Sequence, residues 1–187
     1  MSSPERSPSR TGKAPRWAWW VATGLGSGRL KPAPGTWGSL AALVAWVLLA
    51  LAIRLLPDRW LVEAAFLLLP ILLTWVSVKA SDLVVRETGD KDPGYIVADE
   101  WAGLWIALWP LRWALLVQLQ APGWGLVLVL AVPFALFRLF DIWKPWPIRQ
   151  IQVLPEGQGV VADDVVAGLY ALVLGPLLFQ NLMRCLV

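Results

Sequence analysis

The stretch Val165–Met183 reads Val-Val-Ala-Gly-Leu-Tyr-Ala-Leu-Val-Leu-Gly-Pro-Leu-Leu-Phe-Gln-Asn-Leu-Met, and its 19 residues carry no charge. An uninterrupted apolar run of about 18 residues or more is long enough to cross the hydrocarbon core of a bilayer as a helix. The stretch is rich in Leu and Ala and lacks the two-residue alternation of apolar and polar side chains that is typical of a strand. It therefore predicts a membrane-spanning helix.

Four other apolar runs precede this stretch. They are Leu40–Ile53, Ala64–Val78, Trp101–Leu119 and Trp124–Phe137. Flanking Trp, Arg and Glu side chains can extend such runs by reaching the membrane interface, so we expect most of them to span. Helices buried inside a membrane-associated bundle are the alternative. The predicted fold is all-α, a membrane-embedded bundle of about four to five apolar helices.

The overall composition supports the same class. The chain of 187 residues is 58% hydrophobic and only 16% charged, against about 25% charged in an ordinary soluble domain. Fourteen tryptophans suit a protein that meets the boundary between hydrocarbon and water. The chain has no histidine, which excludes His-dependent triads, phosphohistidine chemistry and His-ligated zinc. The single cysteine, Cys185, excludes an internal disulfide framework.

The net charge of +3 is concentrated before the first apolar run. We expect residues 1–20 to form a disordered basic tail that touches anionic lipid, and residues 21–187 to form a single domain. No basic patch with interleaved aromatic residues follows, so nucleic acid is not an expected partner. The charges of the tail are Glu5, Arg6, Arg10, Lys13 and Arg16.

Three polar segments separate the apolar runs, at residues 24–39, 79–100 and 138–164. If the four middle runs cross the membrane as two hairpins, all three segments emerge on one face. Most of the Lys and Arg residues lie on that side, which the positive-inside rule assigns to the cytoplasm. We therefore expect the polar loops to converge on the cytoplasmic face.

Two adjacent acidic pairs stand before apolar helices, and their surroundings are alike. Asp99 and Asp164 each begin the pattern Asp-x-x-Ala-Gly-Leu-aromatic, and the partners in the pairs are Glu100 and Asp163. Each pair is expected at a helix start, where the Ala-Gly step would allow close packing against a neighbouring helix. A single acid in such a place is most often an N-cap.

With Asp92 and Asp141, these pairs bring many carboxylates to one face. So many negative charges would repel one another unless a cation lay among them. Oxygen ligands without histidine favour a hard cation, for which Mg²⁺ is the default. The sequence therefore predicts a magnesium site.

Positive charge is expected beside these acids. In Phe137–Pro147, Arg138, Asp141 and Lys144 are spaced three apart and would share one helical face before Pro145 ends the helix. Anchoring at the membrane interface is one interpretation, and a wall of a polar site is the other. Lys31, in a Gly/Pro-rich segment, adds a third cation. Carboxylates, Mg²⁺ and such cations together suit phosphoryl chemistry.

Four groups of residues, in order along the chain, resemble the phosphatidylglycerophosphatase A family. They are Pro34-Gly35-Thr36-x-Gly38-Ser39, Ile96-Val97-x-Asp99-Glu100-x-x-Gly103, Phe137-Arg138-x-Phe140-Asp141-Ile142-x-Lys144-Pro145-Trp146-Pro147-Ile148 and Asp163-Asp164-Val165-x-Ala167-Gly168. The resemblance implies a multi-pass protein of the bacterial inner membrane with its active site facing the cytoplasm. It further implies Mg²⁺-dependent removal of the terminal phosphate of phosphatidylglycerophosphate, which yields phosphatidylglycerol.

We assign residue roles on this basis. Asp141 is a further metal ligand or the base that orients water, and the choice between direct water attack and an aspartyl-phosphate intermediate stays open. The predicted metal ligands are Asp92, Asp99, Glu100, Asp163 and Asp164. The predicted catalytic residues are Asp99, Glu100, Asp141, Asp163 and Asp164. The predicted substrate-binding residues are Lys31, Thr36, Ser39, Arg138 and Lys144.

Two other functions are weighed, and the oligomeric state is left open. A CDP-alcohol-type membrane phosphotransferase also uses helix-borne aspartates and metal, but its Asp-Gly-x-x-Ala-Arg core is missing from this sequence. A non-enzymatic membrane transporter or assembly protein would account for the hydrophobicity, with the acids binding ions or capping helices.

Overall fold

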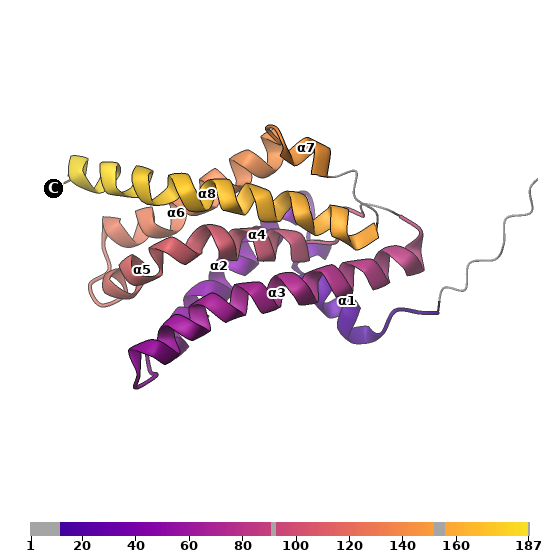
Figure 1. Ribbon diagram of the computed structural model, residues 1–187, viewed down its shortest axis with the longest axis horizontal. Coiled ribbons are helices and arrows are strands. Elements are labelled where there is room, and N and C mark those ends of the chain that lie inside the picture. The colour runs from indigo at the N-terminus through magenta and orange to yellow at the C-terminus, as the bar shows by residue number, and fades with distance from the viewer. Residues whose placement is uncertain (1–11, 91–92, 152–155, 187) are drawn as a thin grey trace, which may run out of the picture.

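The computed structural model describes residues 12–90, 93–151 and 156–186, and side chains from residue 159 on in the last range. Within these ranges every regular element is a helix (Figure 1), which confirms the all-α prediction. The elements in chain order are α1 (Arg16–Ala22), η1 (Ser27–Arg29), α2 (Pro34–Ile53), α3 (Arg59–Thr88), α4 (Ala98–Leu108), η2 (Trp109–Leu111), α5 (Arg112–Gln118), α6 (Trp124–Trp143), α7 (Ile148–Ile151) and α8 (Glu156–Leu186).

Within the described ranges, four helices are long and apolar enough to cross a membrane, which matches the predicted number of about four to five. They are α2, α3, α6 and the part of α8 at Gly159–Leu186. Each is longer than the apolar run that predicted it, because the helices continue into the flanking residues, which include charged ones in α3, α6 and α8 but not in α2. The helix α3, for example, continues to Thr88 and is capped by Gly89, whose φ of 72° is left-handed and suits glycine. These helices indicate a membrane protein.

The run Trp101–Leu119 forms two short helices instead of one long one. Pro110 lies in η2, where the helical path changes between α4 and α5. Seven of the 11 residues of α4 are buried, and α4 packs against α2, α3, α6 and α8. The alternative of a buried helix therefore holds for α4. Together, α4, η2 and α5 still lead from one end of the molecule to the other before α6 returns (Figure 1).

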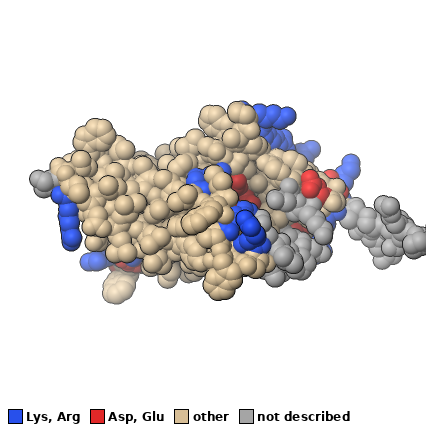
Figure 2. Space-filling model, turned by 90° about the horizontal axis from the view of Figure 1, so that it is seen from above, with Lys and Arg blue, Asp and Glu red and all other residues tan. Residues whose placement is uncertain are grey.

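The outer faces of the long helices are apolar. On α3, exposed residues include Leu68, Ile71 and Trp75, and on α8 they include Val173 and Leu177. Figure 2 shows a broad uncharged surface over one half of the molecule, between the charged residues at its C-terminal end and those gathered over the other half. A water-soluble helix would place polar side chains on such faces, so these surfaces suit contact with lipid.

The helix α1 packs on the C-terminal half of α3. Ala18 and Ala22 are fully buried against Ala80 and Val84 in a small second core. Because α1 begins at Arg16, ordered helix starts within the segment 1–20 that we expected to be a disordered tail. Residues 1–11 of that segment lie outside the described ranges.

The polar segments meet at one end of the bundle. Figure 1 shows α1, the C-terminal end of α3, the N-terminal ends of α4 and α8, and α7 at this end, while the α2–α3 turn lies at the other. The long helices thus bring the predicted site residues to one end of the molecule.

Candidate active site

The site is built on a close contact between α4 and α8. A Cβ atom added at Gly103 would overlap the carbonyl oxygen of Asp164, and one added at Gly168 would overlap the carbonyl oxygen of Gly103. The two Ala-Gly steps that are alike in sequence therefore pack against each other. Their contact sets the distance between the acidic pairs four residues earlier on each helix.

Three carboxylates converge beside this contact. One oxygen from each of Asp99, Glu100 and Asp164 lies within 4.8 Å of the other two. Asp99 and Glu100 lie in the first turn of α4, near the positive end of its dipole. Asp164 lies two turns inside α8, which begins at Glu156, so the second acidic pair is not at a helix start as expected and cannot be a simple N-cap.

The acids of α4 are shielded from water. The exposed fraction of Glu100 is 9%, and its Oε2 atom has no hydrogen-bond partner among the described residues. Burial raises the pKa of Asp99 well above its usual value, and the charge of Glu100 raises it further. Burial also raises the pKa of Glu100 to about 7, against the opposing effect of its hydrogen bond with Asp99. Without a cation, this group of carboxylates is therefore unfavourable in its charged form.

Lys144 joins the site from the end of α6. Its Nζ donates a hydrogen bond to Oδ2 of Asp163 at 2.6 Å, and its φ of 48° turns the chain sharply at the helix end. Partial burial disfavours the ammonium ion, but the hydrogen bond and charge of Asp163 outweigh burial and raise the pKa of Lys144. The chain after Lys144 is fastened to α8, because the Tyr170 hydroxyl donates to the Trp146 carbonyl oxygen at 2.9 Å.

Arg138 links α6 to the carboxylates of α4. Its Nη1 lies 2.5 Å from Oδ2 of Asp141 and 3.8 Å from Oε1 of Glu100. The Asp141 side chain also interacts with that of Asp164. The segment Phe137–Pro147 therefore supports both interpretations. Its charged residues Arg138, Asp141 and Lys144 form one wall of the polar site, and its exposed Trp143 and Trp146 suit anchoring at the membrane interface.

The first turn of α2 covers the site from another side. A Cβ atom at Gly35 would overlap Oε1 of Glu100 and touch the guanidinium group of Arg138. Backbone here lies close to the acids because Gly35 has no side chain. The preceding segment is fastened to the start of α4, where the Val97 amide donates to the Ala22 carbonyl oxygen at 2.8 Å.

The other predicted substrate-binding residues of this segment do not contact the acids directly. Ser39 is buried, and its hydroxyl donates to the Gly35 carbonyl oxygen within α2. Lys31 and Thr36 are exposed near the start of α2. Asp92, a predicted metal ligand, lies outside the described residues. The structure thus brings together seven of the predicted residues: Asp99, Glu100, Arg138, Asp141, Lys144, Asp163 and Asp164.

Several known proteins are similar in sequence to this chain. The sequence profile of phosphatidylglycerophosphatase A matches residues 20–179. The chain belongs to the phosphatidylglycerophosphatase A family. Phosphatidylglycerophosphatase A of Haemophilus influenzae is 36% identical over 154 residues, covering 82% of this chain and 83% of that protein. The Escherichia coli protein of the same name is 36% identical over 149 residues, covering 79% and 75%.

A third relative carries a different name. A protein of Bacteroides thetaiotaomicron, provisionally named phosphatidylinositol-3-phosphatase, is 35% identical over 154 residues, covering 82% of this chain and 88% of that protein. No solved structure matches the chain. Membership of the phosphatidylglycerophosphatase A family makes the chain a phosphoric monoester hydrolase and confirms the resemblance drawn from the motifs.

The donor set of this family member fits a magnesium ion. Asp99, Glu100 and Asp164 offer three carboxylate oxygens close together, and one buried oxygen of Glu100 has no hydrogen-bond partner in the part of the chain that the structure describes. Hard oxygen ligands of this kind suit Mg²⁺ and do not suit the softer metals that prefer sulfur or imidazole. Asp163 differs from these three, because it pairs with Lys144.

Two contributors to the site were missed in the sequence. The sequence places Gly35 only within the family motif, although its lack of a side chain is what allows α2 to touch Glu100. Tyr170 stands within the apolar stretch Val165–Met183, and its hydrogen bond holds the segment that follows Lys144. The signal for Gly35 was present in Pro-Gly-Thr-x-Gly-Ser, whereas no local pattern distinguishes Tyr170.

Proposed function

We propose that this protein is a Mg²⁺-dependent lipid phosphatase that hydrolyses phosphatidylglycerophosphate to phosphatidylglycerol and phosphate. The observation that carries the proposal is the convergence of three carboxylates with Lys144 and Arg138 at one end of a bundle with apolar outer faces. Family membership supports the reaction class. The names of the Haemophilus influenzae and Escherichia coli relatives support the substrate.

The roles follow from the contacts. Asp99, Glu100 and Asp164 would hold Mg²⁺, which when bound polarises a phosphoryl oxygen and increases the acidity of a water molecule. Arg138 and Lys144 would neutralise the charge of the phosphate oxygens. Asp141, oriented by Arg138, is the carboxylate we assign to orient the attacking water. The oxygen of water bonds to phosphorus as the bond between phosphorus and the glycerol oxygen breaks. A proton lost by that water ends on the glycerol oxygen, which gives phosphatidylglycerol and phosphate.

We propose the bacterial inner membrane as the location, with the site facing the cytoplasm. The long apolar helices and the bacterial relatives support a bacterial membrane protein. The basic residues near α1 support the orientation, because Lys and Arg are enriched on the cytoplasmic side of membrane proteins.

The central experiment measures phosphate release from phosphatidylglycerophosphate by the purified protein in detergent. Release should require Mg²⁺, stop with chelator and be lost in Asp164→Asn while the variant remains folded. Asp82→Asn is the matched control, because Asp82 pairs with Arg86 on α3 and lies outside the carboxylate group. Phosphate release that is indifferent to chelator would contradict the metal assignment, and no release would contradict the function.

The same assay separates the alternatives. CMP-dependent exchange of the headgroup would favour the phosphotransferase hypothesis. A parallel reaction with phosphatidylinositol 3-phosphate compares the substrate named for the Bacteroides thetaiotaomicron relative. We expect faster phosphate release from phosphatidylglycerophosphate.

A further inference from the structure

An apolar groove lies beside the first half of α2. It has a volume of about 670 Å³, and no charged residue lines it. One wall is the segment Gly24–Ser27 with Leu30, and the other is one face of α2. The residues of that face are Trp37, Leu40, Ala41, Val44, Ala45 and Leu48.

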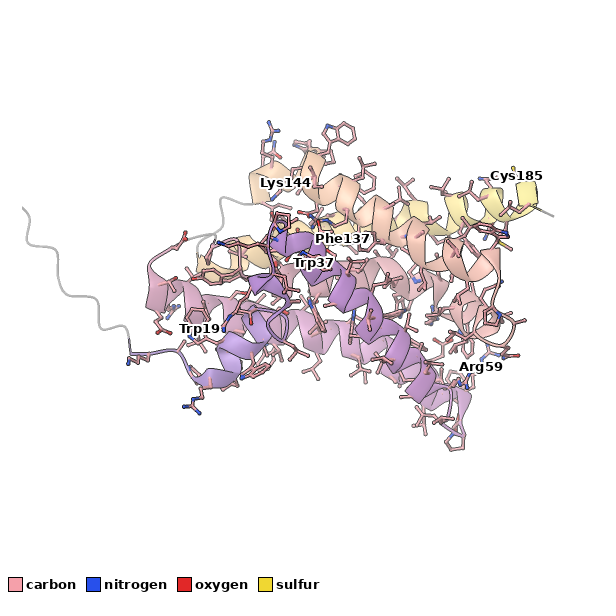
Figure 3. The ribbon with its side chains drawn as sticks, turned by 180° about the vertical axis from the view of Figure 1, so that it is seen from behind. Trp19, Trp37, Arg59, Phe137, Lys144 and Cys185 are labelled. Carbon is pink, nitrogen blue, oxygen red and sulfur yellow. The ribbon has the colours of Figure 1, made fainter. Side chains whose placement is uncertain are left out.

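The groove begins in the same turns of α2 and α4 that contribute to the candidate active site. Trp101, which also lines the groove, directly follows Glu100 in α4. Gly35, whose backbone touches Glu100, lies in the same first turn of α2 as Trp37. Figure 3 shows Trp37 at the same end of the molecule as Lys144. A molecule whose polar part reached the acids could therefore extend its apolar part along α2.

The length of the groove fits one leaflet of a bilayer. Its lining on α2 runs from Trp37 to Leu48, which at about 1.5 Å per residue is roughly 16 Å. Half of a hydrocarbon core of about 30 Å is roughly 15 Å. Trp37 would then lie near the headgroup boundary, where indole rings are enriched, and Leu48 near the bilayer centre.

The walls differ from an ordinary lipid-facing surface. On α3 and α8 the outer surface is a helix face, whereas here the turn Gly24–Gly26 and the start of η1 form one side. A Cβ atom at Gly24 would lie only 2.5 Å from Nε1 of Trp101, so the segment is pressed onto that ring. Val44 and Leu48 remain 58% and 61% exposed, so the apolar groove is open from the side.

We propose that this groove binds one acyl chain of the phospholipid substrate and so guides the phosphorylated headgroup to the acids. The inference rests on the proposed function, since it assumes that the substrate is a lipid phosphate monoester. Burial against Leu40, Val44 and Leu48 would hold the chain parallel to α2. The lipid would enter sideways from the leaflet, along the open side of the groove.

A bulky residue in the groove tests this inference. Ala45→Trp places an indole ring among the lining residues, and Ala52→Trp makes the same change two turns further on α2, beyond the last lining residue. Phosphate release is compared for dioleoyl and dihexanoyl phosphatidylglycerophosphate. Ala45→Trp should lower the ratio of long-chain to short-chain turnover tenfold or more, and Ala52→Trp should change the ratio less than twofold.

Equal ratios in the two variants would overturn the groove assignment while leaving the phosphatase function intact. Failure of the unaltered protein to release phosphate from either lipid would instead refute the proposed function.

A second measurement covers the case in which Ala45→Trp does not fold. The unaltered protein is photolabelled, in the presence of chelator, with phosphatidylglycerophosphate that carries a diazirine on one acyl chain. Labelling should concentrate between residues 37 and 48 and should fall with excess unlabelled phosphatidylglycerophosphate but not with phosphatidylcholine. Labelling spread evenly over the outer faces of α3, α6 and α8 would overturn the proposal.

Discussion

A methyl group added at Gly168 should separate the two helices that carry the acids. In Gly168→Ala, the new Cβ would lie 3.0 Å or less from the Cα, C and O atoms of Gly103, where ordinary contacts are 3.4 to 4 Å. These are backbone atoms, which cannot rotate away as a side chain can. The helices α4 and α8 must therefore move apart by roughly an ångström to restore ordinary contact distances.

Two effects of known size should follow. Overpacking of a well-packed interior costs about 1–3 kcal/mol, so the variant should unfold at a temperature several degrees lower. A displacement of about 1 Å in a catalytic site can cost roughly 10²-fold in rate, so kcat should fall about 30- to 100-fold. The affinity for Mg²⁺ should fall too, because Asp164 moves away from Asp99 and Glu100.

The assays are thermal unfolding in detergent, Mg²⁺ titration and phosphate release from phosphatidylglycerophosphate. Gly175→Ala is the control, since it makes the same change on α8 where a Cβ would meet nothing within 4 Å. Removing a glycine from a helix interior should leave that variant equal or more stable by up to about 1 kcal/mol. If Gly168→Ala matched Gly175→Ala in unfolding temperature and kept kcat within twofold, the backbone contact would not set the geometry of the site.

Three further outcomes are expected. Lys144→Met should lower kcat by roughly 10²-fold or more, because it removes a charge that neutralises the phosphate and the ammonium ion that pairs with Asp163. A kcat equal to that of the unaltered protein would contradict this role. Tyr170→Phe removes the hydrogen bond to Trp146 and should cost about 1 kcal/mol in unfolding free energy with a kcat loss under tenfold, and a larger kcat loss would give the hydroxyl a direct role. Mg²⁺ affinity, measured by calorimetry, should weaken as the pH falls below about 7, because the raised pKa of Glu100 lets protons compete with Mg²⁺ for its carboxylate. An affinity that did not change between pH 8 and pH 5.5 would contradict this.

Much of the fold could be predicted from apolar run length, because four of the five runs form long helices. The exception is Trp101–Leu119, whose apolar content is high for a different reason. The helix α4 is enclosed by other helices, so it is apolar through burial in protein and not through contact with lipid. Hydropathy alone cannot distinguish these two environments. Pro110 was the local sign that this run was not one continuous helix.

The charged residues of the site could also be predicted from the sequence. Adjacent acids, together with charged residues spaced three apart, predict that Asp99, Glu100, Asp164 and Lys144 lie near one another, as they do. Charge repulsion and the absence of histidine led to this grouping. Pairing is harder to predict, because only the packing of α6 against α8 shows that Lys144 engages Asp163.

The segment before α2 illustrates what sequence could not provide. Lys31 and Ser39 are predicted to bind substrate because of their residue types. The Ser39 hydroxyl, however, donates a hydrogen bond to the Gly35 carbonyl oxygen within α2, and Lys31 is exposed. The residue of that segment that lies against the acids is Gly35. A glycine has no chemical group to reveal its role, and its position depends on helices far away in the chain.

The backbone contact between Gly103 and Gly168 has a consequence for adaptation of the protein to different bilayers. Because main-chain atoms set the spacing of the acids, the spacing does not depend on which side chains cover the outer faces of α3, α6 and α8. Those faces can change with bilayer thickness, and the helices can tilt to match it, while the α4–α8 pair keeps its dimensions. Chemistry and membrane fit can thus evolve as separate properties of one small bundle.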